Sequence, residues 1–349
     1  MKQIKIHNKF IGKNNPCFTI AEAGANHEGN LKKALKLIDA AVLGNADSIK
    51  FQTYKAAKLA TKTAPKYWKD KKKNESQFDV FKKLDGLTNS DWKKIFNYAK
   101  KKKIICFSTP FDEESANLLH SLGAPAFKIA SADITHIPLI EHIAKKKLPI
   151  FISTGMASLN EIKEAINTIE KQGNKKIIIM HCITSYPTKS EDANLEMIQA
   201  LSNKFPNYPI GFSDHTLGTN IAVYSTFYGS CCIEKHFTYN KNLKTSPDHR
   251  LSLDSNDFKK LKLELNDAEI SKGVSKRKNF DSESEAVKYA RRSIVTNKNI
   301  SMDELITKEK IAIKRPGIGI SPKFLKKVIG MKAKINLDND QPIQWKDLK

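Results

Sequence analysis

The most constraining feature of the sequence is an eightfold alternation of short, β-rich apolar runs with longer stretches of helical periodicity. The apolar runs are hydrophobic on both faces, which is typical of parallel strands covered by helices. Eight such units favour a closed barrel, because an open doubly wound sheet more often has about five to seven strands. We therefore predict an α/β fold, a (β/α)8 barrel of the TIM type. The eight strand candidates are residues 17–23, 48–53, 104–109, 126–130, 149–153, 176–182, 209–212 and 231–236.

The chain beyond the barrel pattern changes character. A last barrel helix is predicted over residues 257–272, and the stretch SKRKNFDSESE that follows has no hydrophobic period. The tail has short strand candidates and several turns, typical of a small module. We predict a barrel over residues 1–275, a linker over 276–285 and a small β-rich domain over 286–349. Within the barrel, Thr88 followed by Asp91 predicts a capped helix start.

The composition excludes several classes of protein. The net charge is +23, but only five of the 60 basic residues are arginines, and the lysines are spread over almost every predicted helix. Because no aromatic-interleaved basic stripe occurs, we expect solvated helix faces and no nucleic-acid partner. No apolar run reaches about 18 residues, so we expect no membrane partner and a cytoplasmic protein. Five cysteines mostly lie in apolar runs, which favours reduced, buried thiols over a disulfide framework.

Polar residues follow or end every predicted strand. In a (β/α)8 barrel the catalytic groups lie at the carboxyl ends of the strands, and buried ionisable groups are costly without partners. His215 and His236 end neighbouring strands seven and eight. Two adjacent imidazoles with open positions beside them suit a divalent metal site, although each alone could be a hydrogen-bonded core histidine.

Three lysines lie inside predicted strands, where a lysine is costly unless it meets an anion or serves as a neutral nucleophile. With the strand-end hydroxyls they predict a cradle for a small dianionic ligand such as a phosphate plus a carboxylate. A Schiff-base aldolase is the other chemical interpretation, but it leaves the histidine pair without a role. The cradle candidates are Lys50, Lys128, Lys235, Thr109, Ser131, Ser153, Thr184 and Ser213.

An ordered set of strings along nearly the whole chain resembles the N-acylneuraminate (sialic acid) synthase family. The strings are AEAGANHEGN, IKFQTY, STPFD, KIAS, STGM, SYP, GFSDHTLG, EKHFT, PDHR, ARRS and KRPGIGI. No single string is specific, but eleven in this order are. The tail is similar to the antifreeze-like (SAF) domain of that family.

The resemblance implies a condensation of phosphoenolpyruvate with the open-chain aldehyde of an N-acetylated hexosamine. It implies that His215 and His236 hold a divalent metal, Mn²⁺ first, with Mg²⁺ or Co²⁺ as alternatives, and that the lysine and hydroxyl cradle, apart from Lys235, binds phosphoenolpyruvate. It also implies a homodimer in which the SAF domain of one protomer caps the barrel of the other. The remaining implied residues are Glu22 and Glu234 as acid and base, and Gln52, Asn74, Tyr186, Asp248 and Arg315 as sugar contacts.

Two departures from the family pattern concern ligand contacts. Thr184 stands where the family usually has a small amide or serine, and Ser246 stands where a glycine commonly precedes the proline of PDHR. We expect N-acetylneuraminate synthase, with N-acetylmannosamine as acceptor. Legionaminate synthase is the close alternative and pseudaminate synthase a more distant one. Outside this group, a condensing barrel for phosphorylated sugars should carry more arginine, and a non-catalytic binding protein would not need these Lys, Glu and His strand ends.

Overall fold

The computed structural model describes residues 3–68, 75–278 and 280–349. Two compact units divide the chain at Gly273, so that the first is Met1–Gly273 and the second Val274–Lys349. The first unit contains a closed parallel barrel with the strand order β10-β3-β4-β5-β6-β7-β8-β9. The predicted (β/α)8 barrel is therefore confirmed. Its strands are β3 (Phe18–Gly24), β4 (Ser48–Thr53), β5 (Ile105–Pro110), β6 (Phe127–Ile129), β7 (Ile150–Ser153), β8 (Ile177–Cys182), β9 (Ile210–Asp214) and β10 (Cys232–His236).

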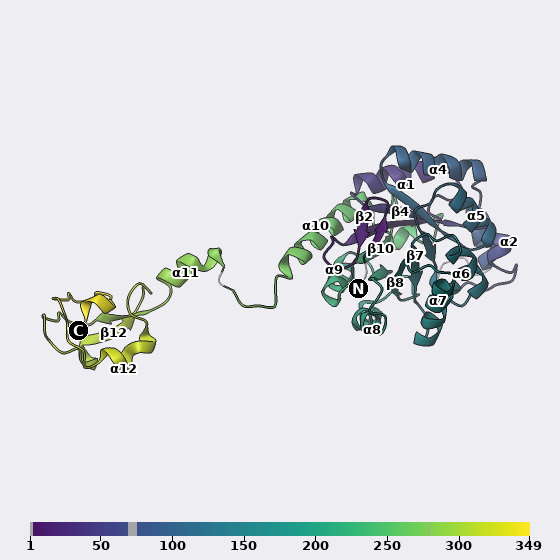
Figure 1. The fold of residues 1–349 in the computed structure, drawn as a ribbon. Helices are drawn as coiled ribbons and strands as arrows, with labels where there is room; N and C mark the ends of the chain where they lie inside the picture. The colour runs from purple at the N-terminus through teal and green to yellow at the C-terminus, as the bar shows by residue number, and fades with distance from the viewer. Residues whose placement is uncertain (1–2, 69–74, 279) are drawn as a thin grey trace. The chain divides into compact units, whose positions relative to one another are not determined.

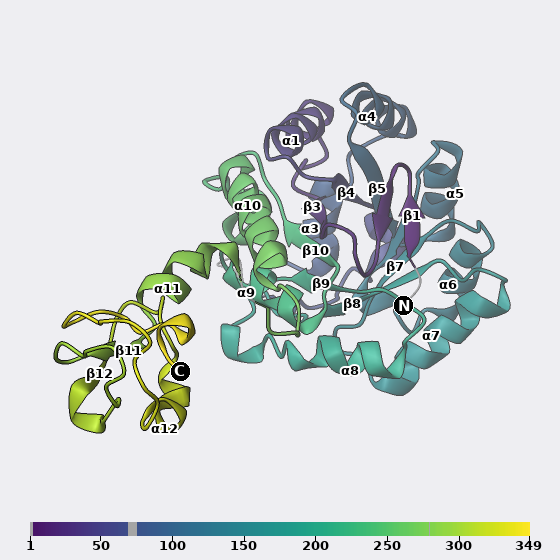
Figure 2. The same cartoon turned by 60° about the vertical axis from the view of Figure 1, so that its left-hand side comes forward.

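Helices surround the strands on the outside of the barrel, as Figures 1 and 2 show. Six of the eight helices that follow the strands begin with a side-chain cap that the sequence encodes. The predicted cap of Thr88 is present as a full capping box with Asp91, and Ser158 with Glu161 forms another. The helices that follow the strands are α1 (Leu31–Leu43), α4 (Asn89–Lys101), α5 (Glu113–Ser121), α6 (Ile137–Ala144), α7 (Leu159–Lys171), α8 (Glu196–Lys204), α9 (Asn220–Ser225) and α10 (Ser255–Ser271).

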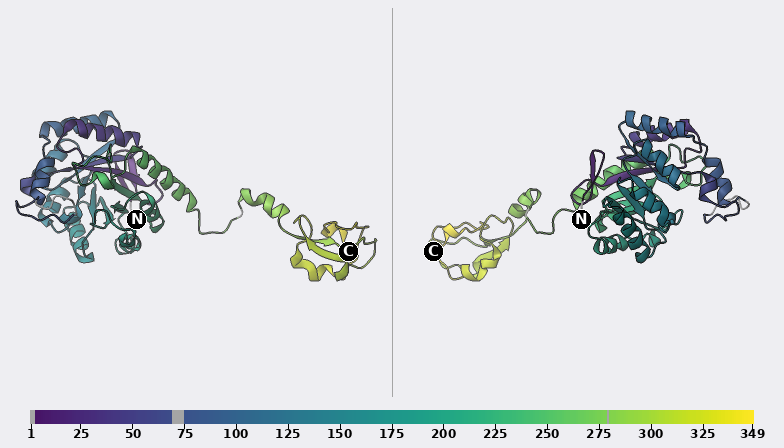
Figure 3. Two further views of the ribbon diagram at one scale, coloured as in Figure 1. Left: turned by 180° about the vertical axis from the view of Figure 1, so that it is seen from behind. Right: turned by 45° about the vertical axis from the view of Figure 1, so that its right-hand side comes forward.

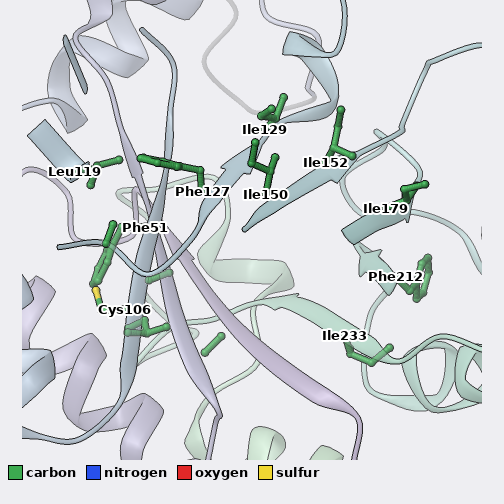
Figure 4. Close-up of a cluster of buried hydrophobic side chains, with 14 of the residues drawn as sticks. Phe51, Cys106, Leu119, Phe127, Ile129, Ile150, Ile152, Ile179, Phe212 and Ile233 are labelled. Atoms are coloured by element: carbon green, nitrogen blue, oxygen red, sulfur yellow. The ribbon is translucent and has the colours of Figure 1, made fainter. Parts of the chain in front are cut away.

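Two short helices, α2 (Ala56–Leu59) and α3 (Gln77–Leu84), are inserted between β4 and α4. The larger hydrophobic core lies between the strands and the helices, where Phe51, Phe127 and Phe212 are buried (Figure 4). Apolar side chains on the outward faces of the strands exclude water from this layer and favour the surrounding helices. All five cysteines are free, and four of them are buried.

A second core fills the amino end of the barrel interior. An antiparallel hairpin of β1 (Ile4–Ile6) and β2 (Lys9–Ile11) packs its isoleucines against Phe18, Phe107 and Phe151 there. This hairpin, purple in Figure 2, was not predicted from the sequence. This aromatic and aliphatic core fills the barrel interior at its amino end and leaves the carboxyl end of the interior for a ligand pocket.

The second unit has a core of its own, which contains Ile294, Ile306 and Val328. Its regular elements are α11 (Ser284–Tyr289), the antiparallel strands β11 (Ser293–Thr296) and β12 (Ile311–Lys314), and α12 (Leu325–Val328), drawn in green to yellow in Figure 3. The predicted small β-rich domain is thus present. In the described part of the chain, no helix is both long and apolar enough to cross a membrane.

Candidate active site

A polar pocket of about 120 Å³ lies at the carboxyl ends of the barrel strands. Every barrel strand contributes to it, either by its last residues or by the loop that follows. Thirteen of the predicted site residues meet there: Glu22, Lys50, Gln52, Thr109, Lys128, Ser131, Ser153, Thr184, Tyr186, Ser213, His215, Glu234 and His236. Side chains distant in sequence thus converge because parallel strands of a closed barrel end at one rim.

Two lysines and two glutamates form the charged centre of this polar pocket. Lys50 Nζ lies 2.7 Å from Glu22 Oε2 and donates to Thr109 Oγ1 over 3.1 Å. Lys128 Nζ donates to Glu234 Oε1 over 2.8 Å. Both lysines and both glutamates are at most 5% exposed. The four charges balance, so an entering anion must draw the lysines away from the glutamates or find a further cation.

The two glutamates differ in their pKa values although both are buried. Burial raises the pKa of Glu22 to about 7, against the opposing effect of Lys50. For Glu234 burial acts in the same direction, but Lys128, Lys50 and the Ser213 hydroxyl outweigh it and hold the pKa below its usual range. Carboxyl pairs whose environments separate their pKa values are typical of acid/base sites.

Two hydroxyls that line the polar pocket make no hydrogen bond within the described part of the chain. They are Ser153 Oγ and Thr184 Oγ1, and both atoms are buried. Gly155 leaves space beside Thr184, because a Cβ there would lie 2.3 Å from Thr184 Oγ1 and 2.8 Å from Ser131 Oγ. Buried hydroxyls without partners are costly, so they indicate a ligand with acceptor oxygens.

The two predicted metal ligands face each other across the rim of the polar pocket. The ring centroids of His215 and His236 are 5.3 Å apart. His215 Nδ1 donates to the Ile183 carbonyl over 2.7 Å, which leaves its Nε2 with a free lone pair. His236 Nδ1 is buried without a hydrogen-bond partner in the described residues, and burial lowers the pKa of this imidazole well below its usual range.

A histidine ligand must be neutral and must present a bare nitrogen. His236 meets both conditions, whereas at His215 burial acts to lower the pKa but Cys182 outweighs it and raises the pKa, so a bound cation would have to displace that proton. Asp248 Oδ2 lies 3.7 Å from His236 Nδ1. Within the described residues, no cluster of three or more His, Cys, Asp or Glu side chains forms a complete protein-only metal site. The pair therefore suits an open site that substrate and water would complete, rather than a closed structural one.

A wider outer pocket of about 350 Å³ continues from the polar pocket. Gln52, Tyr186 and His236 line both pockets. The outer pocket is lined by both apolar and polar side chains. The large apolar ones that belong to a single hydrophobic cluster, which we call the apolar wall, are Tyr54, Leu59, Val80, Phe81, Leu84 and Phe111, and the polar ones include Asp133, Ser246, Asp248 and Arg250. Burial raises the pKa of Asp248 to about 6, against the effects of His215 and Arg250.

Two further predicted residues, Arg315 and Lys235, lie elsewhere. Asn74 falls outside the described residues. Arg315 lies in the second unit, where its side chain is exposed. The expectation that Lys235 takes part in the anion cradle is wrong, because Lys235 does not line the polar pocket and pairs instead with Asp214 over 3.0 Å. Lys235 follows Glu234 in the same strand and must point to the opposite face.

Sequence reasoning missed several residues of the two pockets. Cys182 lines the polar pocket, and its sulfur lies 3.9 Å from His215 Nδ1. Cys182 is the last residue of β8, and this position was the feature of the sequence that could have predicted a place in the pocket. Tyr67 lines both pockets and Arg250 the outer one. Arg250 stands in the PDHR string, whereas nothing in the sequence around Tyr67 indicated a role.

Comparison with known proteins places this site in a family. The model of the NeuB family matches residues 37–277 and that of the SAF domain residues 291–349. The N,N'-diacetyllegionaminic acid synthase of Legionella pneumophila is 38% identical over 345 residues, which are 97% of this chain and 96% of that protein. The synthase of the same name from Campylobacter jejuni is 39% identical over 330 residues, which are 93% of this chain and 98% of that protein.

A solved structure supports the same assignment. The N-acetylneuraminic acid (sialic acid) synthetase of Leptospira borgpetersenii is similar to this chain with a TM-score of 0.72 and 35% identity. The match covers 82% of this chain and 95% of that one. The resemblance stated from the sequence is therefore confirmed. The chain belongs to the NeuB family of phosphoenolpyruvate-condensing synthases and carries a SAF domain at its carboxyl end.

Proposed function

We propose that this protein condenses phosphoenolpyruvate with the open-chain aldehyde of 2,4-diacetamido-2,4,6-trideoxymannose, giving a legionaminate-type nine-carbon 2-keto acid and phosphate. From the sequence we placed N-acetylmannosamine first as acceptor and the diacetamido sugar second. Two relatives named as N,N'-diacetyllegionaminic acid synthases, at 38% and 39% identity, favour the second.

The observation that carries the proposal is the pair of connected pockets of different character. The inner, polar pocket offers cations and unpartnered hydroxyls, which suit the phosphate and carboxylate of phosphoenolpyruvate. The outer pocket presents Leu59, Val80 and Phe81 on its apolar wall. A 6-deoxy sugar with two acetamido groups has methyl groups that such a wall would cover, whereas a 6-hydroxyl would lose its water there.

The anion would be held by side chains that line the polar pocket. Lys50 and Lys128 would turn from Glu22 and Glu234 toward the ligand oxygens, assisted by the hydroxyls of Ser153, Thr184 and the other cradle residues. Such a cradle fixes C3 of the enol near the aldehyde. Positioning matters here because phosphoenolpyruvate is a weak carbon nucleophile.

Glu22 would move the proton of the reaction. Water must lose a proton as it adds to C2 of the enol phosphate, and a carboxyl with a pKa of about 7 is matched to that task near neutral pH. Glu234 would remain ionised, with Lys128 2.8 Å and Ser213 3.0 Å from its Oε1. A divalent metal held by His215 and His236 would supply Lewis acidity to the aldehyde oxygen.

The competing chemistries have less support. A Schiff-base lysine must be neutral, but Glu234 holds the pKa of Lys128 above its usual range although burial acts to lower it. Lys235 lies outside both pockets. A phosphorylated acceptor would call for arginines in the sugar site, and of the described residues that line the outer pocket only Arg250 is one.

The test is phosphate release from phosphoenolpyruvate in the presence of Mn²⁺. N-acetylmannosamine, 2,4-diacetamido-2,4,6-trideoxymannose and its altrose isomer are offered in parallel. We expect the highest kcat/KM with the diacetamido mannose, and loss of turnover with EDTA or with His215→Ala. A higher kcat/KM with N-acetylmannosamine would instead support N-acetylneuraminate synthase, the function expected from the sequence. No release with any of the three sugars would contradict the proposal as a whole.

A further inference from the structure

Asp214 and Lys235 form an ion pair that neither pocket uses. Lys235 Nζ lies 3.0 Å from Asp214 Oδ2, and their side chains are 1% and 0% exposed. Neither residue lines the polar pocket or the outer pocket. Taking two charges out of water costs several kcal/mol per ion before their attraction is counted. An apolar pair would fill the same space at lower cost, so stability alone is a weak explanation for these charges.

The pair stands directly behind the two histidines. Asp214 precedes His215 at the end of β9, and Lys235 precedes His236 in the neighbouring strand β10. The two strands are in register with Lys235 opposite Asp214. Because successive side chains of a strand point to opposite faces, the ion pair lies on the outer face while the imidazoles point into the barrel.

Further hydrogen bonds tie the ion pair to the backbone on the other side of His215. Lys235 Nζ donates to the Thr216 carbonyl over 2.6 Å. Asp214 accepts from the Thr216 backbone N–H over 2.8 Å and from its hydroxyl over 3.1 Å. The residues before and after His215 are thus both bound to the residue that precedes His236. We call Asp214, Thr216 and Lys235 the strand clamp.

We propose that the strand clamp is a positioning device for the two imidazoles, which fixes their separation and ring orientation and thereby sets the affinity of the site for a divalent cation. This inference rests on the proposed function, in which His215 and His236 are the metal ligands. Charges and hydrogen bonds are directional, so they hold two strand ends in one geometry where apolar packing would allow several. Residues that orient metal ligands typically contribute about 10- to 100-fold to metal affinity.

The experiment measures Mn²⁺ binding to the full chain without turnover, by electron paramagnetic resonance titration of free Mn²⁺. The variants are Lys235→Met and the double variant Asp214→Asn with Lys235→Met. Lys235→Met leaves Asp214 buried and unpaired, so it lowers the unfolding temperature, whereas the double variant removes both charges and recovers much of it. We expect Kd for Mn²⁺ to rise about 10- to 100-fold in both variants.

A matched control is Lys262→Met. Lys262 Nζ lies 2.7 Å from Asp47 in a partly buried ion pair, and neither residue lines a pocket. We therefore expect this variant to bind Mn²⁺ with wild-type affinity. Wild-type affinity in the folded double variant would overturn the positioning role, because the clamp would then serve stability only. A wild-type protein that binds no Mn²⁺ and releases no phosphate would instead contradict the proposed function, so the two failures are distinguishable.

Discussion

Two glutamates at neighbouring strand ends show how a residue's surroundings, rather than its type, determine its chemistry. Glu22 meets one lysine, Lys50, whereas Glu234 Oε1 accepts from both Lys128 and Ser213 and lies 3.8 Å from Lys50. Of these two glutamates, only Glu22 therefore has its pKa raised, to about 7. The sequence named both as acid and base through the family resemblance, but it could not tell them apart, because the difference lies in which lysine reaches which carboxylate.

Glu22→Gln should remove the proton transfer while keeping the shape of the side chain. We expect kcat to fall by about 10²- to 10⁴-fold, the usual contribution of a general base. The carboxylate form of Glu22 is the active one, and its pKa is about 7. The ratio of wild-type to variant kcat/KM should therefore rise as the pH increases through about 7. Phosphate release measured from pH 5.5 to 9 gives this ratio.

The ionisation of phosphoenolpyruvate changes kcat/KM of both proteins equally, so its effect cancels in the ratio. A ratio that stays level across pH 7 would assign the proton to another group. Lys128→Met serves as a contrast, because it should weaken phosphoenolpyruvate binding but keep the rise of turnover with pH. Since Lys128 acts to lower the pKa of Glu22, its loss should move that rise to higher pH.

Sequence reasoning at this scale succeeded for the side chains that face into the barrel near the strand ends and failed for Lys235, which faces outward. Thirteen predicted side chains meet in the polar pocket because strand ends share one rim. Lys235 was assigned to the same pocket although Glu234 and His236 flank it. Successive side chains of a strand point to opposite faces, so Lys235 cannot share a face with Glu234 and His236. This alternation was the signal in the sequence that should have excluded Lys235 from the pocket. Its partner Asp214 was detectable only from the pairing of β9 with β10.

At the scale of elements, the barrel strands were predictable and the amino-terminal hairpin was not. The strands are apolar on both faces, which is a strong local pattern. The hairpin of β1 and β2 has three residues in each strand, and its isoleucines matter only because the barrel interior receives them. Such a short segment has no stability of its own, so its structure depends on tertiary contacts that no local pattern encodes.

Ile6→Ala tests the role of the hairpin as a plug. Ile6 is fully buried against the interior core, so we expect a loss of about 2 to 5 kcal/mol in the free energy of unfolding. KM for phosphoenolpyruvate should not change, because the polar pocket lies at the opposite end of the barrel. Urea unfolding and steady-state kinetics measure the two quantities. Ile270→Ala is the matched control, since Ile270 is 72% exposed and should cost less than about 0.5 kcal/mol.

At the scale of the whole molecule, the sequence predicted two kinds of unit, a barrel and a small β-rich domain. Each has a core of its own, with Ile294 and Val328 in the second. The relation between the units was inferred from the family resemblance alone. No local pattern encodes it, because Arg315, the side chain that should join them, is one exposed basic residue among many in a chain with a net charge of +23.

We propose that the SAF domain of one protomer completes the sugar site of its partner through Arg315, and complementation between two defective chains tests this. Glu22→Gln inactivates the barrel, and Arg315→Ala should raise KM for the sugar by about 10-fold or more, since a buried charged hydrogen bond is lost. Heterodimers of the two variants are isolated by two different affinity tags after co-expression. In a swapped dimer, one of the two sites combines an intact barrel with an intact Arg315, so about half of the wild-type activity should return at low sugar concentration. If each SAF domain served its own barrel, both sites of the heterodimer would be defective and no activity would return, because every intact Glu22 would face an alanine at position 315.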